Sequence, residues 1–130
     1  MPRLPLALLS LGLALSMPAS AAMASTLGVY QTTDRKMDYE LALCGSDGRA
    51  LCVTLLDARD SAATPRVTPY IGRQVVREAR PAGANRWRGS MRVGQYELNG
   101  TLTLRPGETF VMSGCVFVVM CDDFTLIPAQ

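Results

Sequence analysis

Apolar and polar residues alternate with a period of two through most of the chain after residue 24, and turn residues interrupt this alternation at short intervals. The clearest example runs from Tyr96 to Arg105, where apolar residues and a glycine alternate with polar residues. A strand that buries one face against a core and exposes the other shows this pattern. We therefore expect strands, not helices, through most of the chain.

The same criterion predicts an all-β fold of about eight strands joined by short turns. Further strands are expected over residues 37–44, 51–55, 70–78, 87–93, 109–120 and 124–127. Pro81 and Gly83 are expected to end the 70–78 strand. The nearly continuous apolar run at 109–120 indicates a strand buried on both faces or covered by another segment. The longest irregular piece, residues 58–69, has room for a short helical turn. Regularly spaced strands of this kind favour a small antiparallel barrel or sandwich.

Residues 1–24 have the features of a secretory signal peptide. Arg3 supplies the positive charge, an apolar stretch follows from Leu4 to Leu15, and Ala22-Met23-Ala24 fits the small-x-small cleavage pattern. The alternative cuts lie after residues 21 and 22. The apolar stretch is shorter than the roughly 20 residues of a transmembrane helix. We therefore predict a single mature domain at 25–130, periplasmic or secreted, with no transmembrane segment after cleavage.

Four cysteines lie in the predicted mature domain, namely Cys44, Cys52, Cys115 and Cys121. An even number of cysteines in a short exported chain indicates disulfide bonds. Zinc binding is the alternative, but the chain has no His and no Cys-x-x-Cys pair. The spacing favours local pairing among the three connectivities. In a hairpin turned at 45–48, the first two cysteines are predicted to lie directly opposite each other on the polar face.

Charge is distributed unevenly, although the 13 Lys and Arg against 11 Asp and Glu give a net charge of only +2. Residues 34–60 lean acidic, whereas residues 66–92 hold seven arginines and a single acid, Glu78. Arginine binds carboxylate and phosphate through a forked geometry. We therefore expect an anion-binding surface, with the alternative that these arginines only occupy outward strand positions. The candidates for this surface are Arg73, Arg77, Arg88 and Arg92.

The absence of His removes the commonest general base and excludes Ser-His-Asp and Cys-His arrangements. Paired carboxylates occur at 38 and 40, 57 and 60, and 122 and 123. We interpret the first pair as a solvated strand face and Asp122-Asp123 as a turn. The sequence therefore predicts no enzyme, no catalytic residue, no metal site and no cofactor. Nucleic-acid binding is not expected in this compartment either.

An ordered set of short motifs resembles the bacterial family of unknown function called DUF2147. After the signal peptide, the motifs are Gly28-Val29-Tyr30, Leu43-Cys44-Gly45, Leu51-Cys52, Gly72 before Val75-Val76, Trp87-Arg88-Gly89 and Ser113-Gly114-Cys115, followed by Cys121. The resemblance covers nearly the whole mature chain. It implies a small lipocalin-like (calycin-type) barrel with no established activity. The chain departs from the family in lacking an Asn-Pro step within 57–65 and in having Phe124 near a usual tryptophan motif.

Six residues are predicted to point into the barrel, because they fall on the apolar side of the alternation: Tyr39, Leu41, Trp87, Met91, Tyr96 and Leu98. In a lipocalin-like barrel such residues line a cavity that holds one small ligand, and the alternative is that they fill the interior. The first hypothesis is a non-enzymatic exported barrel that binds a small apolar or amphipathic ligand. The second is an envelope interaction module whose arginine-rich face binds an anionic envelope component or an acidic protein.

Overall fold

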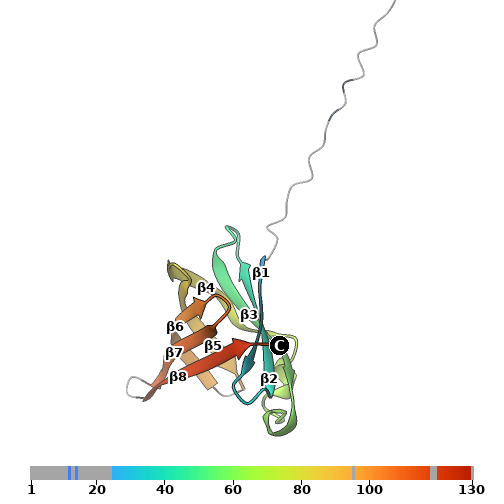
Figure 1. Ribbon diagram of the computed structural model, residues 1–130, viewed down its shortest axis with the longest axis vertical. Coiled ribbons are helices and arrows are strands. Elements are labelled where there is room, and N and C mark those ends of the chain that lie inside the picture. Colours follow the sequence, from blue (N-terminus) through green and yellow to red (C-terminus); the bar gives the residue numbers. More distant parts are fainter. Residues whose placement is uncertain (1–11, 13, 15–24, 95, 118–119, 130) are drawn as a thin grey trace, which may run out of the picture.

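The computed structural model describes residues 12, 14, 25–94, 96–117 and 120–129, and within them eight antiparallel strands form a closed barrel (Figure 1). Each strand pairs with the next along the chain, and β8 pairs back with β1. The strands are β1 (Ser25–Thr32), β2 (Met37–Cys44), β3 (Ala50–Ala58), β4 (Gln74–Gly83), β5 (Arg86–Val93), β6 (Tyr96–Arg105), β7 (Thr109–Phe117) and β8 (Met120–Pro128). The predicted all-β antiparallel barrel is confirmed. The predicted signal peptide lies outside the described residues, apart from Gly12 and Ala14.

Two single 3₁₀ turns, η1 (Asp60–Ala62) and η2 (Thr68–Tyr70), lie in the long connection between β3 and β4. The connections after β1, β3, β5 and β7 gather at one end of the barrel, which we call the mouth end. Those after β2, β4 and β6 gather at the other, which we call the closed end. In Figure 1, the β3–β4 connection is the green loop at the bottom and the β2–β3 turn is at the top.

The core follows from the alternation of the strands. Trp87 and Met91 of β5 are buried, whereas Arg88 and Arg92 between and beside them are exposed. The most completely buried side chains come from strands all around the barrel: Leu41, Leu51, Val53, Leu55, Leu102, Met112 and Leu126. Removal of this apolar surface from water is the main favourable contribution to folding.

Both predicted local disulfides are present, Cys44–Cys52 and Cys115–Cys121. The prediction that Cys44 lies directly opposite Cys52 is wrong, because the two cysteines are offset by two residues along the ladder. Cys44 lies opposite Ala50 and Cys52 opposite Ala42, so the bridge joins diagonal neighbours whose Cα atoms are 5.9 Å apart. The ladder extends further toward the turn than expected. Disulfides persist in oxidising surroundings, so they indicate a compartment other than the cytoplasm.

Strand β4 is displaced along the sequence from its predicted position. The expected 70–78 strand begins only at Gln74 and continues to Gly83, and Pro81 lies inside it. Ala79 is the last β4 residue paired with β3, so the strand beyond it has a neighbour on one side only. Proline is tolerated in such edge positions because no ladder hydrogen bond is lost there.

The expected single strand over 109–120 is two strands. The ladder pairs Cys115 with Cys121 and Phe117 with Met120, so the chain reverses inside the apolar run. β7 is also not buried on both faces, because Phe110 and Met112 are buried whereas Ser113 is exposed. The hydrophobicity of residues 109–120 gave no indication of a turn. β8 is correspondingly longer than the predicted 124–127 strand.

Candidate functional site

A pocket of about 410 Å³ occupies the interior of the barrel at its mouth end. The strand-borne residues that line it come from β2, β5, β6 and β8, which lie around the barrel and so enclose the space between them. Val67, from the connection between β3 and β4, also contributes to the wall. The full lining is Met37, Tyr39, Val67, Met91, Val93, Leu98, Asp122, Asp123 and Phe124.

Three of the six predicted interior residues line this pocket, namely Tyr39, Met91 and Leu98. Leu41 and Trp87 are buried in the closed part of the core instead. The Trp87 indole Nε1 donates a hydrogen bond to the backbone carbonyl oxygen of Arg49, 3.0 Å away, in the turn at the closed end. The side chain of Tyr96 lies outside what the structure describes. For the five residues whose side chains are described, alternation identified the inward face correctly but not the height of each residue along the barrel.

The sequence interpretation missed the two acids of the lining. Asp122 and Asp123 were expected in a turn, but they belong to β8, where both are exposed. Reading the alternation backwards from Leu126 through Phe124 would have placed Asp122 on the inward side. These two carboxylates are the only charged groups in the described lining of the pocket.

Tyr39 is the polar feature of the pocket interior. Its side chain is 1% exposed, and its hydroxyl donates to the Met37 Sδ atom at 3.7 Å, a weak acceptor. Burial raises the pKa of the Tyr39 phenol, so the hydroxyl stays neutral. The ring meets Phe124 edge to face, with centroids 6.2 Å apart and an interplanar angle of 84°.

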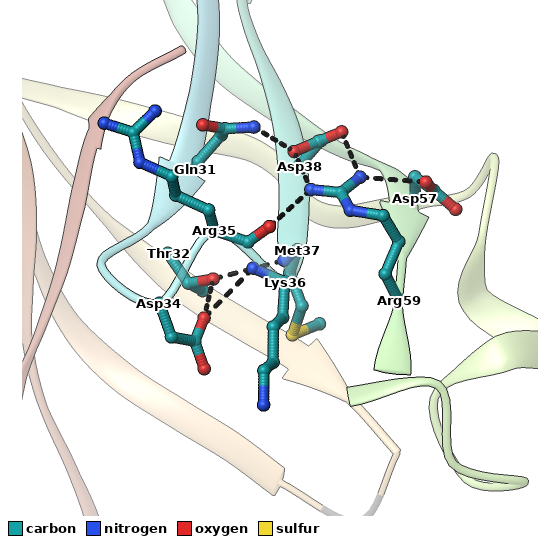
Figure 2. Close-up of polar contacts among 9 residues, drawn as sticks. All are labelled: Gln31, Thr32, Asp34, Arg35, Lys36, Met37, Asp38, Asp57 and Arg59. Carbon is teal, nitrogen blue, oxygen red and sulfur yellow. Dashed lines mark hydrogen bonds and ion pairs between the residues drawn. The ribbon is translucent and has the colours of Figure 1, made fainter. Parts of the chain in front are cut away.

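An ionic network supports the wall beside the pocket (Figure 2). Arg59 Nη1 donates to Asp38 Oδ2 at 2.7 Å and to Asp57 Oδ2 at 2.9 Å, and Nη2 donates to Asp38 Oδ1 at 2.9 Å. Nη2 also donates to the backbone carbonyl oxygen of Arg35 at 2.6 Å. Gln31 Nε2 adds a bond to Asp38 Oδ1 at 2.8 Å. The network therefore joins β1, β2 and β3.

The position of Asp38 explains what this network does. Hydrogen bonding to Arg59 lowers the pKa of Asp38, against the opposing effect of burial, and keeps the carboxylate ionised. Such a group is a poor proton donor at neutral pH. Asp38 lies between Met37 and Tyr39, both of which line the pocket. The network thus fixes the part of β2 that forms the pocket wall.

The four predicted anion-binding arginines are only partly brought together. Arg77 and Arg92 border an outer groove of about 330 Å³ on β4 and β5, together with Tyr70, Gln74, Val75 and Ser90. Arg88 lies further toward the closed end, opposite Arg80 in the ladder. Arg73 is exposed just before β4. Among the described residues, none of the four predicted arginines forms an ion pair.

Comparisons with protein-family models, with curated proteins and with solved structures found no match. The resemblance to DUF2147 therefore stays a prediction. Among the described residues, no group of three His, Cys, Asp or Glu side chains is placed to hold a metal ion. In the same part of the chain, no helix is long and apolar enough to cross a membrane.

Proposed function

We propose that this protein is a non-enzymatic binding protein, periplasmic or secreted, that holds the apolar part of a small ligand in the pocket at its mouth end. The observation that carries the proposal is the pocket itself. Its volume of about 410 Å³ falls within the range of about 300–1,000 Å³ typical of small-molecule sites. Its wall is apolar apart from Tyr39 and the two acids.

The contrast with the rest of the barrel supports a binding role. Toward the closed end, inward side chains such as Leu41, Leu102 and Met112 are completely buried against one another. At the mouth end, Leu98 and Phe124 also face inward but remain only half-buried. A ligand that covers these side chains gains roughly 25 cal/mol for each Å² of apolar surface removed from water.

The proposed compartment rests on two independent features. The two disulfides require an oxidising environment, and residues 1–24 have the pattern of a signal peptide. In an aqueous compartment, a carrier that covers the apolar part of an amphipathic molecule keeps that molecule in solution. A closed barrel with an accessible apolar pocket suits that task.

Filling the pocket is the direct test. Val93→Phe places a ring in the lining and is expected to weaken binding of octanol about tenfold or more, because ring and ligand compete for one space. Val111→Phe is the matched control, since Val111 lies on the outward side of β7 between Phe110 and Met112. NMR titration, followed at the Leu98 methyl groups, measures both affinities. Equal octanol binding by the two variants would contradict the proposal.

The outer groove between Arg77 and Arg92 supports a second function, binding of an anionic envelope component or an acidic protein. Two arginines border one hollow there without an ion-pair partner among the described residues. An unpaired guanidinium binds carboxylate and phosphate readily. Glu97 lies opposite Arg92 in the β5–β6 ladder and reduces the positive charge beside the groove.

Charge reversal tests this second function. Arg77→Glu with Arg92→Glu is expected to reduce binding to phosphatidylglycerol-containing vesicles about tenfold at low salt, because attraction becomes repulsion. Arg105→Glu is the control, because it reverses the charge of an arginine outside the groove, at the β6–β7 turn of the closed end. Co-sedimentation at two salt concentrations measures the effect. If the double variant and the Arg105 variant bind alike, the groove is not the site.

A further inference from the structure

The charge at the mouth of the pocket is opposite in sign to the charge of the chain. The protein carries a net charge of +2, yet the described lining holds two carboxylates and no Lys or Arg. Both acids are exposed, and Asp122 lies one alternation before Phe124 on the inward side of β8. The charged residues of the described lining therefore place negative charge near the water-facing end of the pocket.

The aromatic residues of the pocket point to the same ligand chemistry. Tyr39 and Phe124 meet edge to face in the pocket wall, and Phe124 follows directly after Asp123. The faces of aromatic rings attract cations, and aromatic walls beside carboxylates suit substituted ammonium groups. This observation is independent of the acids, because it concerns the ring positions and not the charge of the rim.

We propose that the pocket takes a cationic amphiphile, with an ammonium group at the rim near the inward-facing Asp122 carboxylate and the Phe124 ring, and with the alkyl chain among Met91, Val93 and Leu98. This inference rests on the proposed function and adds the ligand class. A fatty acid fits the same apolar wall, but its carboxylate would face two like charges at the rim. The one lysine of the sequence, Lys36, donates from Nζ to Ser61 Oγ at 2.7 Å and is not part of the lining.

Three ligands with one tail test the head group. Octyltrimethylammonium, octanol and octanoate are titrated separately into the full oxidised protein below their micelle concentrations, with NMR shifts of the Leu98 and Val93 methyl groups as the readout. The ammonium is expected to bind about fivefold more tightly than the alcohol and at least about tenfold more tightly than octanoate. Added salt is expected to narrow these ratios.

Variants then assign the preference to the rim. In Asp122→Asn with Asp123→Asn, the ratio of ammonium to alcohol affinity is expected to fall about threefold or more. Phe124→Leu keeps an apolar side chain but removes the ring, and is expected to lower the same ratio. Glu108→Gln, in the turn at the closed end, removes a carboxylate far from the pocket and is expected to leave the ratio at its original value.

The outcomes separate the two proposals. If octanol or octanoate binds as tightly as the ammonium, the cationic ligand class is overturned and the apolar pocket stands. If the ammonium preference survives in the double Asn variant, its assignment to the rim acids is overturned. If none of the three ligands shifts the pocket methyl groups, both this inference and the proposed function fail.

Discussion

Leu102→Ala is expected to lower the free energy of unfolding by about 3 kcal/mol, and Leu98→Ala by no more than about half as much. The two leucines share the inward face of β6, four residues apart. Leu102 is 0% exposed in the closed core, so its truncation leaves a cavity. Leu98 already faces the pocket, so its truncation mainly enlarges a space that exists.

Urea unfolding of the oxidised protein, followed by Trp87 fluorescence and circular dichroism, measures this difference. Thr103→Ala, on the outward side of the same strand, is the surface control and is expected to change stability by less than about 1 kcal/mol. If Leu102→Ala does not fold, Leu102→Val gives a smaller loss in the same direction. Equal losses at positions 98 and 102 would indicate a filled barrel and would count against the binding proposal.

Gly100→Ala is expected to destabilise the protein by about 3 kcal/mol, the upper part of the range for overpacking. A Cβ atom at this position would collide with the backbone carbonyl oxygen of Ser113 and would lie 2.6 Å from the Cα atom of Gly114. Both belong to β7, the strand paired with β6. The backbone of a paired strand cannot move away without breaking ladder hydrogen bonds. A small shift of β7 therefore cannot relieve the strain.

Gly48→Ala provides the comparison for Gly100. Gly48 has a φ of +68° and no atom within 4 Å of the added Cβ, so only the unfavourable backbone conformation contributes. Its expected cost is about 1 kcal/mol. Thermal and urea unfolding of both variants distinguish the mechanisms. If Gly100→Ala is no more destabilising than Gly48→Ala, then β6 and β7 tolerate a wider separation than this barrel has.

The architecture divides the barrel interior into two parts. Toward the closed end, Trp87 is buried and anchored to the Arg49 carbonyl oxygen. Toward the mouth end, the Arg59 network fixes β2, and the Cys115–Cys121 bridge joins β7 to β8 immediately before Asp122. Because the pocket wall is held rigidly, less conformational entropy is lost when a ligand binds.

The features that depend on neighbouring residues could be predicted from the amino-acid sequence. Alternation assigned the inward faces of β2, β5 and β6, including Tyr39 and Met91, because successive side chains of a strand point to opposite sides. Local spacing favoured the pairing of Cys44 with Cys52 and of Cys115 with Cys121. Both inferences need only a few residues of context.

Which inward residues contact one another depends on how the strands pair around the barrel. Closure of β8 onto β1 and the register of each ladder set the height of every side chain along the barrel, and the closure joins residues far apart in sequence. Tyr39 and Leu98 therefore line the pocket, whereas Trp87 belongs to the closed core. The pairing of β7 with β8 turned the 109–120 run into a hairpin and placed Asp122 and Asp123 at the mouth. Alternation carries no information on these points, because it repeats identically at every height along a strand.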